Sequence, residues 1–110
     1  MHCLAPDASA EDAEELSART GVTRFPVRDG ATMVGYLHLK ETLSVPPSGR
    51  DEPLPARSIR PLPALDASLT LPAVLEFMRD GQTPIVHVMA DGTSRGIATL
   101  DDVLARLIQR

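Results

Sequence analysis

Apolar residues spaced three and four positions apart predict the helices of this chain. The clearest stripe lies over residues 71–80, a second one starts at Leu100, and a weaker one covers 10–20. Thr70 precedes the first of these as an N-cap, and Ser9 or Asp7 precedes the weak one. Gly81 and Gly21 follow them as helix ends. The stripe residues are Leu71, Val74, Leu75 and Met78, and then Leu100, Val103, Leu104, Leu107 and Ile108.

Two short apolar runs broken by Asp-Gly predict two β-hairpins. Residues 24–27 lead to a turn at Asp29-Gly30 and return through 32–37. Residues 85–89 lead to Asp91-Gly92 and return through 94–98. Asp-Gly between apolar runs favours a tight turn because glycine accepts a positive φ. Each hairpin therefore follows a helix and precedes another.

These elements form an internal repeat with a spacing of 61 residues. Five pairs share that spacing: Phe25 and Val86, Val27 and Val88, Gly35 and Gly96, Leu39 and Leu100, Leu43 and Leu104. Gly30 and Gly92 lie 62 apart, which we interpret as a one-residue insertion at the turn. The helix that begins at Leu39 is expected to be short, since Pro46-Pro47 cannot continue it.

The repeat predicts an α/β fold of two units, each with the order strand, helix, strand, strand, helix, related by an approximate two-fold axis. The first repeat covers 1–45, with a leading strand truncated to residues 1–4. Residues 46–58, rich in proline and charge, are predicted to be an extended linker. The second repeat covers 59–110 and takes its leading strand from residues 58–65.

Composition narrows the function classes. The 110 residues suit one ordinary domain, and a net charge of −4 with three aromatic residues argues against nucleic-acid binding. The single Cys3 excludes an internal disulfide and a cysteine-based zinc cluster. No apolar run is long enough to span a membrane and no signal peptide is evident, so a cytoplasmic location is expected. The sequence shows no metal-ligand spacing among His2, His38 and His87, so no directly bound metal is predicted. No catalytic triad or phosphate loop stands out, so no enzyme activity is predicted.

The repeated segments resemble tandem CBS domains, the Bateman module. The resemblance is carried by Arg24–Val27, by Val34–Lys40, by Ile59–Leu62 and by Gly96–Leu104, and it covers nearly the whole chain. The segments look like the module of the bacterial magnesium and cobalt efflux proteins, the hemolysin-like CorC and cyclin M family. The turn Met89–Gly96 departs from that family's acidic, aromatic, double-glycine turn.

The resemblance implies an adenosine-nucleotide site at Thr99-Leu100-Asp101-Asp102. Asp102 would accept hydrogen bonds from the ribose hydroxyls, and charge-assisted bonds of that kind are about twice as strong as neutral ones. The residues alone favour another interpretation, because Thr-x-x-Asp before an apolar stripe is also a capping box. Both interpretations remain open at this point.

The resemblance implies further contacts around that motif. Ile59, Thr83, Pro84 and Ile85 would wall the adenine, and Arg24 or Arg60 would neutralise phosphate. Core packing and ordinary exposed arginines are the alternatives. In the first repeat the matching positions hold His38 and Glu41, a degraded motif that favours one nucleotide per chain.

We therefore expect a regulatory module that senses an adenosine nucleotide, ATP or AMP with or without magnesium. Its expected partners are a second copy of the chain, since family members pair through their helices, and the membrane domain of a parent efflux protein. The alternative is a structural dimerisation module that binds no ligand.

Overall fold

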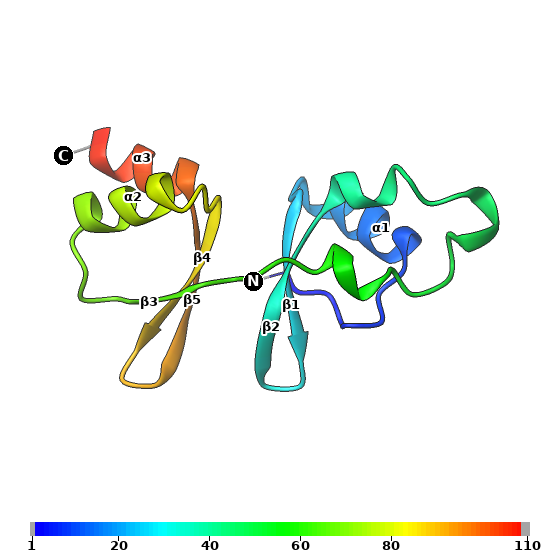
Figure 1. Cartoon of the computed structure of the whole chain (residues 1–110), viewed down its shortest axis with the longest axis horizontal. Helices are drawn as coiled ribbons and strands as arrows, with labels where there is room; N and C mark the ends of the chain where they lie inside the picture. The colour runs from blue at the N-terminus through cyan, green and yellow to red at the C-terminus, as the bar shows by residue number, and fades with distance from the viewer. Residues whose placement is uncertain (1, 109–110) are drawn as a thin grey trace. The chain divides into compact units, whose positions relative to one another are not determined.

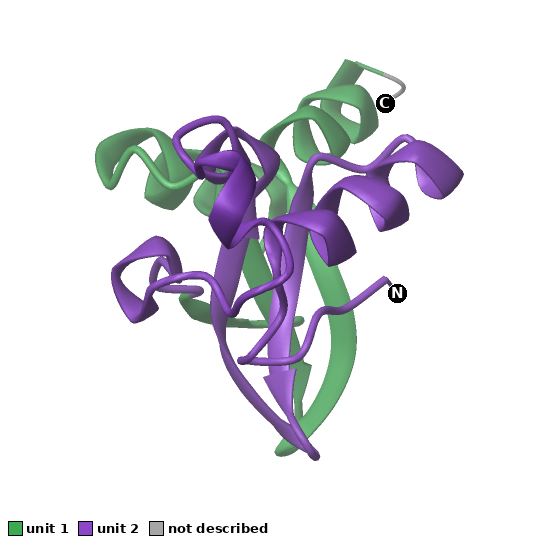
Figure 2. Cartoon of the chain, turned by 90° about the vertical axis from the view of Figure 1, so that its right-hand side faces the viewer, with its two compact units in different colours: residues 1, 63–110 green, residues 2–62 purple. Residues whose placement is uncertain are grey.

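The computed structural model describes residues 2–108 and divides them into two compact units (Figure 2). The N-terminal unit is His2–Leu62, and the C-terminal unit contains residues 63–108. The first holds α1 (Ala10–Thr20), β1 (Arg24–Asp29), β2 (Thr32–His38) and three 3₁₀ turns, η1 (Leu39–Thr42), η2 (Pro47–Gly49) and η3 (Ala56–Ser58). The second holds β3 (Ala64–Asp66), α2 (Leu71–Asp80), β4 (Ile85–Ala90), β5 (Thr93–Thr99) and α3 (Leu100–Ile108) (Figure 1).

The predicted mixed α/β pair of repeats is confirmed, down to the residue spacing. Helices α1 and α2, strands β1 and β4, and strands β2 and β5 each begin 61 residues apart. Val27 pairs with Gly35 as Val88 pairs with Gly96, and each hairpin shifts register directly after that valine. The two valines thus occupy equivalent places in the two units.

The predicted insertion at the turn is wrong. Asp29 pairs with Thr32 and Ala90 pairs with Thr93, so both hairpins have two-residue loops at the same spacing. Asp91 and Gly92 both have positive φ, at 51° and 74°, as a type I′ turn requires. In the first hairpin the loop is Gly30-Ala31, so glycine has moved by one place within a loop of unchanged length.

The leading strand of each repeat pairs with the first strand of its hairpin, which is β1 in the N-terminal unit and β4 in the C-terminal unit. Leu65 pairs in parallel with Val88 inside β3, and Leu4 forms the equivalent bridge to Val27. The leading strand of the second repeat is therefore at 64–66, later than predicted from 58–65. Arg60 instead forms an antiparallel bridge with Tyr36 of the N-terminal unit, where its N–H and C=O are both bonded.

Residues 46–58 are not extended. They contain η2 and η3, and Pro53 forms a bridge to Ser9 while the Leu54 N–H donates to the Ala8 carbonyl at 2.9 Å. Arg50 is ion-paired with Glu14 of α1. The side chain of Leu54 is buried in the N-terminal core. This segment is therefore a folded part of its unit, held by backbone hydrogen bonds and by the burial of Leu54.

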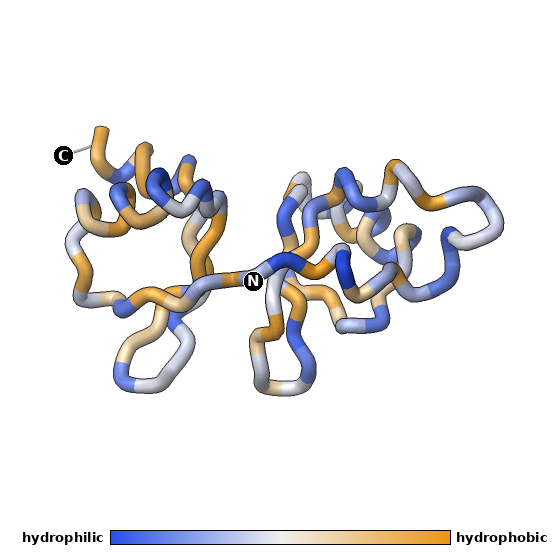
Figure 3. The backbone as a smooth tube through the Cα atoms, in the orientation of Figure 1, coloured by the Kyte–Doolittle hydropathy of each residue, from blue (hydrophilic) through white to orange (hydrophobic). Residues whose placement is uncertain are grey.

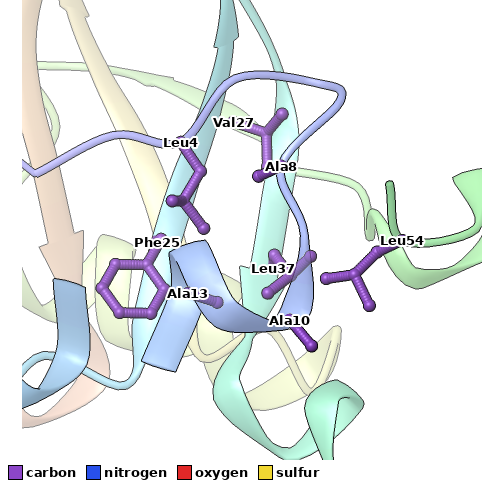
Figure 4. Packing of buried hydrophobic residues seen from close by; sticks show 8 residues of the cluster. All are labelled: Leu4, Ala8, Ala10, Ala13, Phe25, Val27, Leu37 and Leu54. Carbon is purple, nitrogen blue, oxygen red and sulfur yellow. The ribbon is translucent and has the colours of Figure 1, made fainter. Parts of the chain in front are cut away.

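The N-terminal core lies between α1 and one face of the hairpin (Figure 4). Ala10 and Ala13 are the small residues by which α1 approaches the sheet closely, and Phe25, Val27 and Leu37 meet them. Because side chains alternate along a strand, Arg24, Tyr36 and His38 belong to the opposite face.

The C-terminal core is smaller. Met78 of α2, Val86 of β4 and Val103 of α3 are its buried residues. Thr70 caps α2 as predicted, with its hydroxyl accepting from the Ala73 N–H at 3.2 Å. Gly81 ends the helix but stays right-handed, and Gln82 takes the positive φ of 49°. The apolar stripe of α3 is only partly used, since Leu104 is 38% exposed and Ile108 is 84% exposed.

Candidate nucleotide site

The start of α3 carries the Thr99–Asp102 motif. Strand β5 runs directly into the helix, so Thr99 is the last strand residue and Asp102 lies in the first turn. The Thr99 N–H donates to Asp102 Oδ2 at 3.0 Å, and the Asp102 N–H donates to Thr99 Oγ1 at 3.2 Å. This reciprocal pair is a complete capping box. The capping interpretation is therefore realised in the geometry.

The same box occurs at the start of α1, where no nucleotide residue was predicted. The Ser9 N–H donates to Asp12 Oδ2 at 2.9 Å, and the Asp12 N–H donates to Ser9 Oγ at 3.1 Å. A capping box by itself thus does not identify a ligand site. What separates Asp102 from Asp12 is its surroundings.

Two predicted adenine-contact residues lie beside Thr99. Ile85 is its register partner on β4, and the Pro84 carbonyl accepts from the Leu100 N–H at 3.0 Å. Ile85 is fully buried and alternates with Val86, so it belongs to the sheet face away from α2 and α3. Thr83 and Pro84 also line a hollow of about 360 Å³ with Met78, Arg79, Gln82 and Leu100. Pro84 and Ile85 thus lie next to the Thr99–Leu100 junction, whereas the lining of the hollow includes Thr83 and Pro84 but not Ile85, Thr99 or Asp102.

The carboxylate of Asp102 remains able to accept more bonds. Its Oδ2 serves the cap, and Oδ1 has no hydrogen bond from any residue among 2–108. The residue is exposed, and it lies where the N–H groups of the first helical turn favour an acceptor-bearing ligand. Capping and acceptance from a ribose diol are thus compatible.

The other predicted residues, Arg24, Ile59 and Arg60, belong to the N-terminal unit. Arg24 is opposite His38 at the open end of the hairpin. Ile59 and Arg60 run along the outer edge of β2, so close to it that a Cβ on Gly35 would lie 2.5 Å from the Arg60 carbonyl oxygen and 2.6 Å from Ile59 Cγ2. Gly35 is the residue that permits this approach.

The degraded motif of the first repeat has its own bonding pattern. The Glu41 carboxylate does not accept a hydrogen bond from the His38 N–H, whereas the Asp102 carboxylate accepts one from the Thr99 N–H. Its Oε1 accepts from Arg60 Nη2 at 3.0 Å, an ion pair that the sequence did not reveal because the two residues lie 19 positions apart. The Nδ1 of His38 accepts from the Lys40 N–H at 3.0 Å. This cap precedes the four-residue 3₁₀ turn η1, which stands where the short helix was expected.

Burial lowers the pKa of His38 below its usual value, and the nearby positive charges of Arg24, Lys40 and Arg60 act in the same direction. Glu41 opposes them. A neutral imidazole is what the cap needs, because Nδ1 can accept the Lys40 N–H only while it carries no proton.

No helix within residues 2–108 combines the length and apolar character needed to cross a membrane. The same residues contain no group of three or more histidine, cysteine, aspartate or glutamate side chains placed to hold a metal ion.

Comparison with known proteins gives consistent matches. The family model for the CBS domain matches residues 1–47 and 56–109. The uncharacterized protein Rv1841c of Mycobacterium tuberculosis is 37% identical over 100 residues, which is 86% of this chain and 28% of that protein. The chain thus spans about a quarter of the length of that curated relative.

Two solved structures share the fold. One is the CBS domain of a bacterial CNNM/CorC family Mg²⁺ transporter in complex with ATP, with a TM-score of 0.88, 20% identity, and coverage of 98% of this chain and 79% of that one. The other is a hemolysin-like protein containing a CBS domain from Oenococcus oeni PSU, with a TM-score of 0.83, 23% identity, and coverage of 97% and 81%. The expected resemblance is confirmed at the level of family and fold.

Proposed function

This chain belongs to the CBS-domain family, and from that premise we propose that it is a regulatory module that binds an adenosine nucleotide at the start of α3. The observation that carries the proposal is the grouping of Thr99 and Asp102 with Pro84 and Ile85 in one unit. A carboxylate with a free oxygen at a helix start, next to main-chain groups and an apolar wall, has the chemistry to hold a ribose and an adenine.

Each residue has a distinct proposed role. Asp102 Oδ1 accepts from the ribose hydroxyls while Oδ2 keeps the cap. Thr99 fixes the carboxylate through the reciprocal bonds. Thr83, Pro84 and Ile85 supply the apolar wall and the main-chain groups that face an adenine edge. ATP is the first nucleotide to test, because a solved CBS domain of the same fold is in complex with it.

The parent protein is proposed to be a membrane protein of the magnesium and cobalt efflux type, with this module on its cytoplasmic side. The support is the similarity to CBS domains of CNNM/CorC family Mg²⁺ transporters and of a hemolysin-like protein. CBS domains are regulatory rather than catalytic modules, so nucleotide binding would be read out as a change in the attached protein, not as turnover.

A second candidate is a structural dimerisation module without a ligand. The observations in its favour are the Ser9–Asp12 box, which shows that the motif geometry arises for capping alone, and the exposed apolar end of α3. Both functions are compatible with a homodimer, so the nucleotide itself is the discriminating test.

The test is calorimetric titration of the chain with ATP, AMP and adenosine, with Asp102→Ala and the matched control Asp12→Ala. Both changes break a capping box and should cost about 1 kcal/mol of stability. Only Asp102→Ala should also weaken nucleotide binding, by about 10- to 150-fold, because it removes a charged acceptor worth about 1.5–3 kcal/mol.

Asp102→Asn refines the comparison, since it retains a capping oxygen and loses the charge. It should preserve the melting temperature of the free chain and still weaken the nucleotide. If the parent chain binds none of the three ligands, the ligand-free dimerisation function replaces the proposal. Nucleotide binding that survives Asp102→Asn unchanged would assign the motif to capping alone.

A further inference from the structure

A second hollow, of about 300 Å³, lies in the C-terminal unit on the side of the sheet that α2 and α3 cover. Its mostly apolar walls come from β3, from the segment between β3 and α2, from β4 and β5, and from both helices. We call it the core hollow. An apolar cavity of about half that volume can hold benzene, so the core hollow has room for an apolar side chain. Neither Thr99 nor Asp102 lines it, so it is separate from the candidate nucleotide site.

The core hollow has a closed counterpart in the N-terminal unit. Figure 4 labels eight residues of the N-terminal core, and for all of them except Leu54 the residue 61 positions later lines the core hollow. Burial differs between the two sets. Ala8 is 7% exposed and Val27 is 1% exposed, whereas Leu69 is 44% exposed and Val88 is only partly buried. The second repeat thus builds the same apolar cluster but leaves it open.

The difference lies in the residue that closes the cluster. In the N-terminal unit the side chain of Leu54, from the segment 46–58, packs among the seven other residues. In the C-terminal unit no side chain among residues 63–108 fills that place, and the core hollow remains there. The fold therefore shows in one unit what kind of group fits the open cluster of the other.

The main chain beside the core hollow repeats the anchor of Leu54. The Leu54 N–H donates to the Ala8 carbonyl at 2.9 Å, directly after a turn in which the Ala8 N–H donates to the Ala5 carbonyl at 3.1 Å. The C-terminal unit has the same turn, in which the Leu69 N–H donates to the Asp66 carbonyl at 3.1 Å. The Leu69 carbonyl accepts none of the hydrogen bonds made within residues 2–108. It is therefore available to the backbone of an extended segment.

Charge at the edge of the core hollow favours an acidic neighbour. Arg106 lines it, is exposed and makes no ion pair with any residue among 2–108. Asp66 also lines it, but its carboxylate already accepts from the Ser68 N–H at 2.8 Å. A segment with an acidic residue close to its apolar one would complement Arg106.

We propose that the core hollow is a docking site for an extended peptide segment from outside residues 2–108. The segment places a leucine-sized side chain in the hollow, bonds its backbone to the Leu69 carbonyl and offers an acidic side chain to Arg106. One apolar side chain and few hydrogen bonds give weak binding, so the site suits a segment that other contacts or a covalent link hold nearby. The proposal does not depend on nucleotide binding.

The probe is a capped peptide with the sequence of residues 51–57, which contains Leu54 and two acidic residues. It is titrated into the methyl-labelled full chain and followed by NMR. We expect saturable shifts of the Val86 and Val88 methyl signals, while those of Val27 in the closed cluster stay unchanged. Leu54→Ala in the peptide should weaken binding about tenfold or more, since most of the buried apolar surface is lost.

Variants of the chain test the charged contact. Arg106→Gln should weaken peptide binding severalfold, roughly the effect of one exposed ion pair. Arg95→Gln is the matched control, because Arg95 is an exposed arginine of the same unit outside the core hollow, and it should change affinity by less than about twofold. Asp102→Asn should bind the peptide as the parent does, so this proposal and the nucleotide proposal fail separately.

Several results would overturn the proposal. They are the absence of saturable shifts at millimolar peptide, equal binding of the leucine and alanine peptides, and equal losses in the two arginine variants. Shifts of the Val27 signals in place of those of Val86 and Val88 would mean that the peptide enters the N-terminal unit. Tighter binding of octanoate than of the peptide would assign the core hollow to a small amphiphile. Movement of the Val86 and Val88 signals on dilution of the free chain would assign it to a second copy.

Discussion

Residues at equivalent positions of the two units make different hydrogen bonds and have different surroundings. Thr99 and Asp102 bond each other, whereas His38 caps through its ring and Glu41 bonds Arg60. Gly35 lies under a crossing chain, whereas a Cβ on Gly96 would meet nothing within 4 Å. The contacts of each residue therefore depend on the neighbouring residues that the rest of the fold places beside it.

Gly35→Ala tests the crossing of residues 59–60 over β2. The new methyl group would overlap the Arg60 carbonyl oxygen and the Ile59 side chain, so we expect a loss of about 1–3 kcal/mol, as for overpacked cores. Urea unfolding gives the measurement. Gly49→Ala is the control, because its φ is not positive and a Cβ there would make only ordinary contacts, at 3.6 Å and beyond. An equal loss in the two variants would contradict the steric argument.

His38 should make stability depend on pH. Its pKa is lower in the folded chain than the usual 6.5, so the unfolded chain takes up a proton first as the pH falls. Stability contributed by the neutral ring is present above about pH 6.5 and is lost as the pH drops below that value.

Thermal melts between about pH 5 and 7.5 would show this dependence. His38→Asn, which retains an acceptor for the Lys40 N–H but does not titrate, should flatten the profile. An unchanged slope in that variant would assign the acid sensitivity to other groups.

The elements were predicted well where a local pattern decides them. Helices 10–20 and 71–80, with Ser9 and Thr70 as caps, follow from stripes and capping residues that a reader sees in the sequence. Three features could not be predicted in this way, because each depends on contacts between residues far apart in sequence. They are the 3₁₀ turn at Leu39–Thr42, the folded segment 46–58 and the Arg60–Tyr36 bridge.

Some features of the candidate site could likewise be predicted from the sequence, and others could not. Thr99 and Asp102 are three residues apart, and their pairing was predictable as a capping box or a ligand motif. The Glu41–Arg60 pair and the unpaired Arg24 Nε have no signature in sequence spacing. Proline-rich composition indicated an extended segment, but the apolar Leu54 within it was the residue that mattered for packing.

Leu54→Ala tests whether residues 46–58 contribute to the fold. Leu54 is 8% exposed and packs in the N-terminal core, so its truncation should cost about 2–4 kcal/mol. Leu69→Ala is the comparison, since Leu69 is 44% exposed and should cost well under about 1 kcal/mol. Denaturant unfolding measures both. Equal small losses would mean that the segment is a spacer after all.

At the scale of the whole molecule, apolar surface remains to be covered. The end of α3 is hydrophobic in Figure 3, and Leu104 and Ile108 share one side of that helix because they are four residues apart. Phe77 of α2, the helix packed against α3, is also 42% exposed. Such surface supports the proposed homodimer through helices.

Ile108→Glu combined with Leu104→Glu should shift the chain from dimer to monomer, because it places charge in an apolar contact. Light scattering at micromolar to high micromolar concentration measures the mass. Ala105→Glu, exposed on the same helix, is the control and should leave the mass unchanged. A parent chain that is monomeric throughout that range would remove the dimer from the proposal.

Because the Arg60 backbone is attached to β2, the segment that connects the two units is shorter than the sequence suggests. The Arg60 backbone is held by Tyr36, and the Pro63 carbonyl accepts from the His87 N–H, so only Pro61 and Leu62 lie between anchored points. Proline fixes φ at 61 and 63 and restricts the residue before each. The connection between the anchored residues is therefore short and restricted in its backbone, and residues inserted to lengthen it would have to enter between 60 and 63.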